Sequence, residues 1–227
     1  MNKQDKQLLI FDFDGTLIDS VPDLADATNT MLEQLGKPTY SLDTIKEWVG
    51  NGSRLLIERA LVGQTVVSAG QVTQEEADHA EQLFFDAYKN ISDSKTVAYP
   101  DVDQGLRQLK DAGFTLALVT NKPIRFVPKI LETLGWSPLF SLVLGGDSLA
   151  VKKPDPAPLL HTCETLHFTP EQTIMIGDSI NDIHAGQRAG IDTFGLAYGY
   201  NYGQDIRDSN PTHAFNTFAE LLELLLP

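Results

Sequence analysis

The stretch Leu8-Leu9-Ile10-Phe11-Asp12-Phe13-Asp14-Gly15-Thr16 joins a short apolar run to two aspartates and a glycine turn. Short runs of Ile, Leu, Val and Phe are typical of strands that are buried on both faces of a sheet. Because side chains alternate along a strand, Asp12 and Asp14 are expected on the same side of a strand over 8–13. Ligands of open α/β sheets bind at the carboxyl edge, where these aspartates would lie. The stretch therefore predicts both the first strand and a site at its end.

Shorter apolar runs later in the chain alternate with helical patterns. The apolar runs lie at 114–119, 142–144, 174–176 and 193–196. The helical patterns lie at 103–112, 123–134, 156–166 and 181–189. Strands that alternate with helices at this spacing predict an α/β fold with a Rossmann-like parallel-sheet core. Pro128 lies inside the second helical pattern and predicts a kink or a break there.

The segment 20–92 differs from the rest because it shows helical patterns and no convincing strand. Thr73 with Glu76 forms a capping-box pattern, which predicts the start of a helix over 77–88. We therefore expect an inserted α-helical domain in this segment.

The remaining residues are expected to form the core, which gives the domain organisation. The core would consist of 1–19 and 93–227, with hinges at Ser20 and in the segment 92–100. The apolar residues of 217–226 recur on one side, which predicts a final helix packed on the core.

The charge and cysteine content exclude several classes of protein. The 227 residues include 17 Lys and Arg against 31 Asp and Glu, a net charge of −14. Such a charge repels nucleic acid and anionic lipid, so we expect neither as a partner. No apolar run approaches the ~20 residues of a membrane span, and the polar start does not match an export signal. The single cysteine, Cys163, excludes an intrachain disulfide, and we expect a cytoplasmic protein.

Three further groups of polar residues follow predicted strands. Thr120 ends the strand over 114–119, Lys153 precedes a proline turn, and Asp178 and Asp182 follow the strand over 174–176. Taken singly, each has a plain structural explanation. Thr120 could cap a helix, Lys153 could be a solvated surface charge, and Asp178 and Asp182 could belong to an ordinary strand–turn–helix junction. Taken together, four strand ends of one core would offer paired Asp, Thr, Lys and Asp.

These motifs, in this order, resemble the haloacid dehalogenase superfamily of phosphotransferases. The Asp-x-Asp-Gly-Thr motif at 12–16 and the Gly-Asp-Ser-x-x-Asp motif at 177–182 carry the resemblance, which covers essentially the whole chain and makes the helical insert a cap domain. Residues 12–20, 49–52 and 145–147 resemble the phosphoglycolate phosphatase branch. The resemblance implies a Mg²⁺-dependent phosphatase that hydrolyses a small phosphorylated metabolite, 2-phosphoglycolate, through an aspartyl phosphate. We expect a monomer or a homodimer.

The resemblance also implies a role for each motif residue. Asp12 would be the nucleophile, and Asp14 would protonate the leaving alkoxide and then take a proton from water. Asp12, the backbone carbonyl of Asp14, and Asp178 would hold Mg²⁺, whose preferred ligands are such oxygens. Asp182 would orient Asp178 or a metal-bound water.

Substrate contacts are expected from both the core and the insert. Thr120 would hydrogen-bond a phosphoryl oxygen, and Lys153 would pair with the phosphoryl group and with Asp12. Further expected contacts are Thr16, Asn51, Gly52, Arg54 and Asn121. Arg54 could reach the substrate carboxylate, although a plain loop with a solvated arginine explains the segment 50–54 equally well.

Three alternatives stay open at this point. The first is a related phosphatase for sugar phosphates, a nucleotide or pyrophosphate, and the second is a phosphomutase of the same superfamily. The third is a catalytically silent metal-binding protein, against which the intact motif residues speak.

Overall fold

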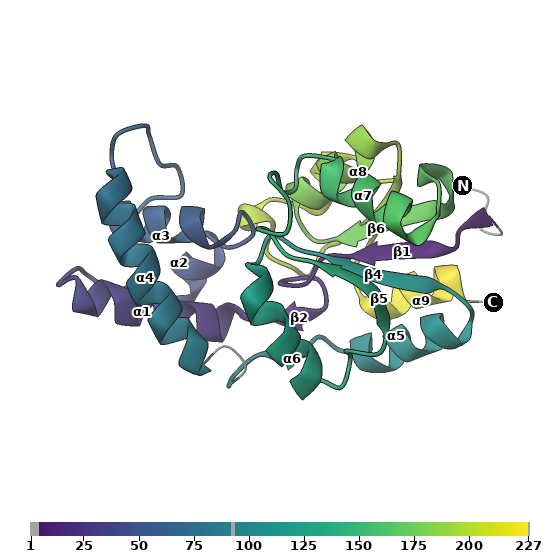
Figure 1. Cartoon of the computed structure of the whole chain (residues 1–227), viewed down its shortest axis with the longest axis horizontal. Helices are drawn as coiled ribbons and strands as arrows, with labels where there is room; N and C mark the ends of the chain where they lie inside the picture. The colour runs from purple at the N-terminus through teal and green to yellow at the C-terminus, as the bar shows by residue number, and fades with distance from the viewer. Residues whose placement is uncertain (1–4, 92–93, 227) are drawn as a thin grey trace.

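The computed structural model describes residues 5–91 and 94–226, and its centre is a parallel β-sheet (Figure 1). Within these residues the sheet has six strands in the order β5-β4-β1-β6-β7-β8, and all neighbours pair in parallel. The strands are β1 (Leu8–Phe11), β4 (Thr115–Val119), β5 (Phe140–Leu144), β6 (Thr173–Gly177), β7 (Asp192–Leu196) and β8 (His213–Phe215). The predicted Rossmann-like α/β core is confirmed.

Helices cover both faces of the sheet, and its central strands are therefore buried on both sides. Leu9 and Phe11 of β1 belong to the larger apolar cluster, which lies under α5 (Val102–Asp111), α6 (Val127–Thr133) and α9 (Phe218–Leu225). Leu8 and Ile10 point to the opposite face, where they pack with residues of α7 (Ala157–Leu166) and α8 (Ile180–Ala189). Alternate residues of one strand thus join two separate cores.

The structure corrects the end of the first strand, confirms the break near Pro128 and adds one strand. The strand over 8–13 ends at Phe11, because the carbonyl of Phe13 accepts hydrogen bonds from the backbone N–H groups of Leu17 and Ile18 and closes a tight turn. The helix over 123–134 is split into a 3-10 turn, η2 (Ile124–Phe126), and α6, and Pro128 lies in the first turn of α6, as its missing N–H requires. Strand β8 was not expected, because three residues are too few to show a period.

Short 3-10 turns complete the core. They are η3 (Pro170–Gln172), η4 (Asn201–Gly203) and η5 (Ile206–Ser209). No described helix has both the length and the apolar character that a bilayer crossing requires.

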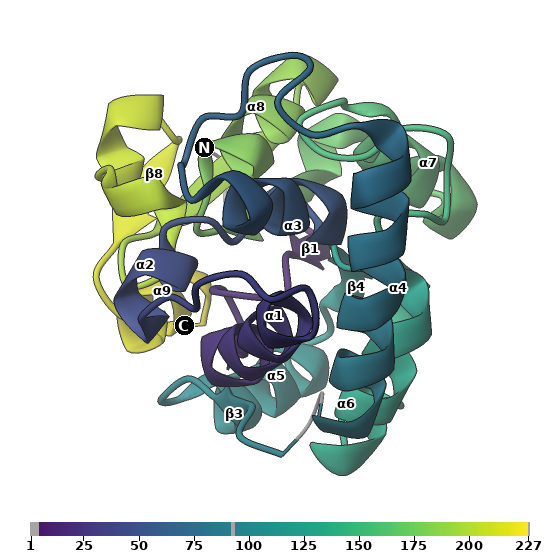
Figure 2. The same ribbon diagram turned by 90° about the vertical axis from the view of Figure 1, so that its left-hand side faces the viewer.

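The cap consists of four helices that lie at one end of the core, in front of the sheet (Figure 2). They are α1 (Val21–Gln34), α2 (Leu42–Lys46), α3 (Ser53–Val62) and α4 (Gln74–Ile91). The Thr73 hydroxyl accepts from the Glu76 N–H and the Glu76 carboxylate accepts from the Thr73 N–H, so the predicted capping box is confirmed. The cap has its own apolar cluster, which includes Trp48, Phe84 and Tyr88.

Two chain segments connect the cap to the core, and they pair with each other. The outgoing segment forms β2 (Ile18–Asp19) and the returning segment forms β3 (Val97–Ala98), as an antiparallel ribbon. Ser20 follows directly and is fully buried, whereas Ser92 of the expected second hinge lies outside the described residues.

The buried carboxylate of Asp23 fastens the returning segment to α1. It accepts hydrogen bonds from the Ser94 hydroxyl and from the N–H groups of Lys95 and Thr96, at 2.8–3.2 Å. The Thr96 hydroxyl donates a further bond of 2.7 Å. A carboxylate can satisfy all these donors because it is an acceptor only.

We predict that Asp23→Asn destabilises the protein by about 2–4 kcal/mol, because an amide NH₂ would face donors that now point at an oxygen. Urea unfolding followed by circular dichroism would measure the change. The control is Asp26→Asn, since Asp26 forms an exposed ion pair with Lys95. Equal unfolding midpoints for the two variants would contradict this account of the linker.

Candidate active site

A cavity lies where the cap meets the ends of the strands. Core residues Asp12, Asp14, Thr120 and Lys122 line one side, and cap residues including Tyr88 line the other. The structure therefore brings together the ends of β1 and β4, although the motifs are about a hundred residues apart in the sequence.

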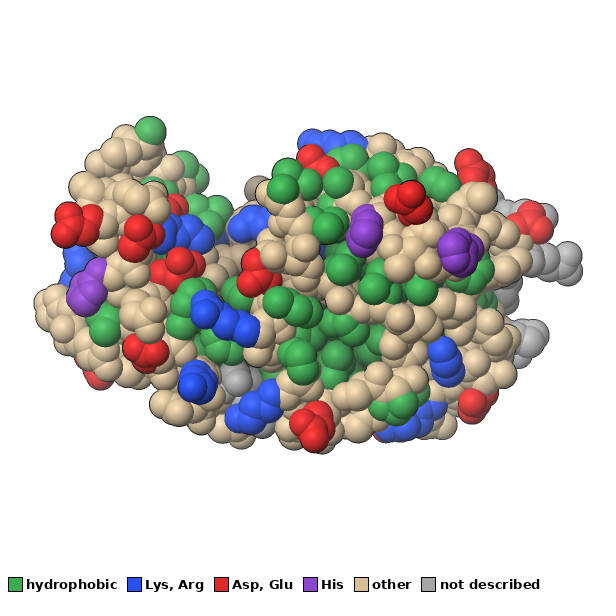
Figure 3. All heavy atoms as spheres, viewed as in Figure 1, with side chains coloured by type: hydrophobic (Ala, Val, Ile, Leu, Met, Phe, Trp, Pro, Cys, Tyr) green, Lys and Arg blue, Asp and Glu red, His purple; other side chains and the backbone are tan. Residues whose placement is uncertain are grey.

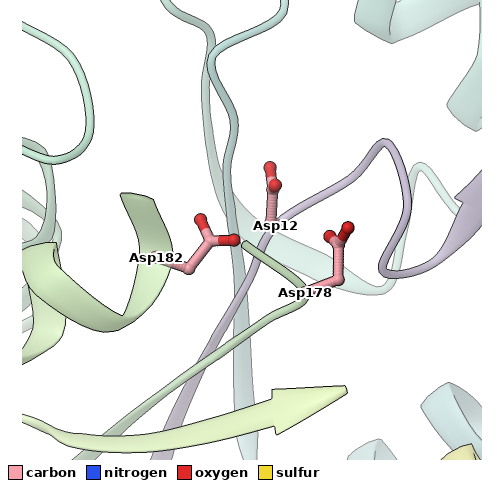
Figure 4. Close-up of side chains that lie close together, drawn as sticks. All are labelled: Asp12, Asp178 and Asp182. Atoms are coloured by element: carbon pink, nitrogen blue, oxygen red, sulfur yellow. The ribbon is translucent and has the colours of Figure 1, made fainter. Parts of the chain in front are cut away.

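Three carboxylates converge beside this cavity (Figure 4). Asp12 follows β1, Asp178 follows β6, and Asp182 lies in the first turn of α8. One oxygen of each lies within 4.8 Å of the other two, and all three residues are buried. Such a cluster of like charges requires compensation by cations and hydrogen-bond donors.

Neighbouring donors hold two of these carboxylates in place. Asp178 accepts from the Thr16 hydroxyl at 2.6 Å and from the Tyr200 N–H at 2.7 Å. Asp182 accepts from both the N–H and the hydroxyl of Ser179, at 3.0 Å each. The Thr16 hydroxyl is thus directed at a carboxylate of the cluster, and Thr16 is fully buried.

Glycine at position 15 is required by the packing around Asp178. Gly15 has a φ of +86°, and a Cβ there would lie 2.3 Å from an Asp178 carboxylate oxygen. This contact explains why a glycine follows the second aspartate of the motif.

Lys153 supplies the positive charge inside the cluster. Its ammonium lies 2.9 Å from Asp12 Oδ1 and 2.7 Å from Asp182 Oδ1, and it donates a hydrogen bond to the Val119 carbonyl. Burial lowers the pKa of Lys153, but Asp12 and Asp182 outweigh that effect and raise it. Lys153 therefore stays protonated between the two carboxylates.

One ammonium does not balance three carboxylates. Burial, with Asp182 adding to it, raises the pKa of Asp12 to about 7. Burial, together with Asp12 and Asp182, raises the pKa of Asp178 well above its usual range. Asp12 Oδ1 and Asp182 Oδ1 are buried, and the Lys153 ammonium is the partner that they share. Clustered oxygen donors with surplus negative charge fit a hard divalent cation.

Asp14 is held apart from this cluster. Its carboxylate lies 3.0 and 3.3 Å from the Lys122 ammonium and accepts a hydrogen bond from the Ser20 hydroxyl. The ammonium of Lys122 also donates to the Tyr88 hydroxyl of the cap at 2.7 Å. Asp12 and Asp14 thus face one cavity with different cations beside them, Lys153 and Lys122 respectively.

Thr120 and Asn121 lie on the cavity wall after β4. The Thr120 hydroxyl accepts from the Lys122 N–H at 3.2 Å. Asn121 donates to the carbonyls of Gly50 and Lys153, at 3.2 and 2.9 Å, and these two bonds fix the orientation of its amide. The Gly50 carbonyl also accepts from the amide of Asn181 at 3.2 Å, so the loop after β4 and the first turn of α8 both hold the cap loop.

The three residues of the cap that we expected to contact the substrate differ in their surroundings. Gly52 lines the cavity and has a φ of +89° at the start of α3. Asn51 has a buried amide oxygen with no donor among the described residues. Arg54 does not line this cavity, because its guanidinium pairs with Glu58, Asp78 and Glu81 of the cap.

Neither Tyr88 nor Lys122 was among the site residues expected from the sequence. Tyr88 lies on the apolar side of α4, where its pattern is that of a core residue. Lys122 follows Thr120 by two residues, and this proximity to a motif residue was the only signal in the sequence.

Known proteins with similar sequences identify the family of this chain. The family model described as haloacid dehalogenase-like hydrolase matches residues 9–196. This chain belongs to that family. A Psychrobacter arcticus protein named phosphoglycolate phosphatase is 70% identical over 98% of this chain and 96% of its own length. A Colwellia psychrerythraea protein of the same name is 49% identical over 98% of each chain.

Solved structures of the haloacid dehalogenase-like family show the same fold. The crystal structure of a predicted phosphoglycolate phosphatase from Haemophilus somnus superposes with a TM-score of 0.89. It is 37% identical and covers 97% of this chain and 98% of its own. Both the core and the cap therefore have counterparts in this relative.

We predict that Mg²⁺ raises the melting temperature more at about pH 8 than at about pH 5.5. Without metal, folding becomes less favourable as the pH rises from the ordinary Asp value of 3.8 through about 7, because the folded protein retains a proton on Asp12 that the unfolded chain releases. Scanning fluorimetry in EDTA and in Mg²⁺ would measure both effects.

In Asp12→Asn the position no longer titrates, so the difference between the two pH values should shrink. Asp111→Asn, an exposed position on α5, is the matched control and should behave as wild type. An identical Mg²⁺ effect at both pH values in the wild type would contradict the prediction.

Proposed function

We propose that this protein is a Mg²⁺-dependent phosphatase that hydrolyses 2-phosphoglycolate to glycolate and phosphate. The observation that carries the proposal is the pair of carboxylates on one cavity: Asp12 beside Lys153, and Asp14 beside Lys122. The substrate is supported by the relatives named phosphoglycolate phosphatase, which align over nearly the whole chain. Cytoplasmic location and a monomeric or homodimeric state stay predictions from the sequence.

Asp12 acts as the nucleophile in this proposal. A carboxylate oxygen of Asp12 attacks phosphorus, the bond to the ester oxygen breaks, and the phosphoryl group is carried as an aspartyl phosphate. The Lys153 ammonium, 2.9 Å from Asp12, reduces the repulsion between the carboxylate and the phosphate. Two easier displacement steps thus replace a single step with a higher barrier.

Asp14 carries the proton in both steps. It donates its proton to the departing glycolate oxygen, and then takes a proton from the water that attacks the aspartyl phosphate. Its position on the cavity wall, apart from the carboxylate cluster, allows this second role.

Other residues position the phosphoryl group. Because the Thr120 oxygen accepts from the Lys122 N–H, its own O–H is left to donate to a phosphoryl oxygen. Gly52 on the cap side and Asn121 on the core side of the cavity are proposed substrate contacts, as is Asn51, whose buried amide oxygen lies next to Gly52 in the chain. Thr16 is proposed to act through Asp178, which its hydroxyl contacts.

Mg²⁺ would be held by Asp12, Asp178 and the backbone carbonyl of Asp14, with Asp182 orienting these ligands. The ion would neutralise charge on the phosphoryl oxygens. The donor set of clustered, buried carboxylates fits such a hard cation.

The cap encloses the reaction. Leu24, Val49, Leu56 and Phe84 form an apolar wall opposite the carboxylates, which keeps bulk water away from the phosphoryl group. A covalent phosphoryl intermediate would then meet only the water that the site positions.

We predict that Asp12→Asn lowers phosphate release from 2-phosphoglycolate by at least about 10³-fold, because the amide is a poor nucleophile. The assay compares 2-phosphoglycolate with hexose phosphates, nucleotides and pyrophosphate, in Mg²⁺ and in EDTA. Asp111→Asn is the matched control and should retain wild-type release.

The substrate panel also distinguishes the alternatives. Preference for a sugar phosphate would reject the proposed substrate and keep the chemistry. Transfer of the phosphoryl group to a sugar, instead of release as phosphate, would indicate a mutase. Full turnover by Asp12→Asn would reject Asp12 as the nucleophile.

A further inference from the structure

The substrate of the proposed reaction has a second anionic group close to the phosphate. A single methylene separates the ester oxygen of 2-phosphoglycolate from its carboxylate. Once the phosphoryl group lies beside Asp12, the carboxylate must therefore lie inside the same cavity. A selective site needs a cation there, because a buried carboxylate without one is costly.

The cavity wall offers one such group. Among the described residues that line the cavity, Lys122 is the one with a cationic side chain. Lys153 lies behind Asp12, between two carboxylates of the cluster, and is almost fully buried. Lys122 is thus the cation that meets the part of the cavity beyond the phosphoryl group.

The contacts of Lys122 hold its ammonium at a defined place. It donates to the Tyr88 hydroxyl at 2.7 Å and to Asp14 Oδ1 and Oδ2 at 3.0 and 3.3 Å, and its side chain is only 3% exposed. An ammonium has three N–H groups, and the contact with Asp14 Oδ2 is the longest of the three. A substrate carboxylate would replace Asp14 Oδ2 as the acceptor of that N–H, while the other two contacts hold the ammonium in place.

Rival cations lie nearer to the surface. Figure 3 shows Lys and Arg side chains between the cap and the core, and Arg54, Arg125 and Lys152 line an adjoining cavity. The Arg54 guanidinium already pairs with three carboxylates. That of Arg125 lies over the Phe85 ring, 3.6 Å from its centre. None of the three lines the cavity that Asp12 lines.

We propose that Lys122, positioned by Tyr88 of the cap, binds the substrate carboxylate and selects 2-phosphoglycolate over uncharged phosphate esters of the same size. The inference rests on the proposed function, because it assigns a contact for that substrate. Tyr88 belongs to the cap and Lys122 to the core, so the carboxylate is recognised where the two domains meet.

The test compares kcat/KM for 2-phosphoglycolate with that for phosphoglycolamide, in which a neutral amide of the same size replaces the carboxylate. Lys122 also contacts Asp14, so its replacement should slow both esters, and only the ratio reports on the carboxylate. We expect wild type to prefer 2-phosphoglycolate by about 10- to 100-fold, and Lys122→Met to reduce this preference to near one. Lys122→Arg should retain part of it, and Tyr88→Phe should lower it by a smaller factor.

Lys110→Met, in α5, is the control for loss of a lysine and should keep the wild-type ratio. A wild-type ratio in Lys122→Met would overturn the inference, as would loss of the preference in Arg54→Gln. Wild-type enzyme that releases no phosphate from 2-phosphoglycolate would instead reject the proposed function.

A binding measurement covers the case in which Lys122→Met has no measurable turnover. In the Asp12→Asn background, calorimetry would compare the affinities of the two esters with and without Lys122→Met. A preference for the carboxylate that disappears with Lys122 supports the inference, and one that remains overturns it. Circular dichroism of each variant confirms that it is folded.

Discussion

The burial of three carboxylates at one sheet edge is the constraint on which the rest of the structure depends. Asp12, Asp178 and Asp182 repel one another in a region that water does not screen. Lys153 compensates part of this charge, and hydrogen bonds from Ser179, Thr16 and the Tyr200 N–H stabilise the rest of the cluster. The remaining surplus is what makes the site suitable for a divalent cation.

Much of the fold and the centre of the site could be predicted from the sequence. The strands of the core are short apolar runs, and their order along the chain brings Asp12, Thr120 and Asp178 to one edge whatever the details of the loops. The break near Pro128 could be predicted for a related reason, because a missing N–H acts locally. Features that depend on a few residues close together in the sequence could therefore be predicted.

Features that depend on contacts between distant segments were not. The direction of Asp14 depends on Lys122, Ser20 and a tyrosine of the cap, and no periodicity reveals which cap residue meets which core loop. The sequence offers Arg54 as a cation for the substrate carboxylate, but α4 brings carboxylates to it from more than twenty positions away. The apolar pattern of a helix identifies its buried face and does not show that one member of that face carries a functional hydroxyl.

The paired linkers have a mechanical consequence. A domain attached by one flexible strand can twist, slide and tilt, whereas β2 and β3 are hydrogen-bonded to each other and Asp23 joins the returning segment to α1. A two-stranded tether resists torsion and shear and leaves bending as its soft motion. Any bending of this tether would therefore move the cap along one arc, with the contact between the Tyr88 hydroxyl and the Lys122 ammonium at its closed end.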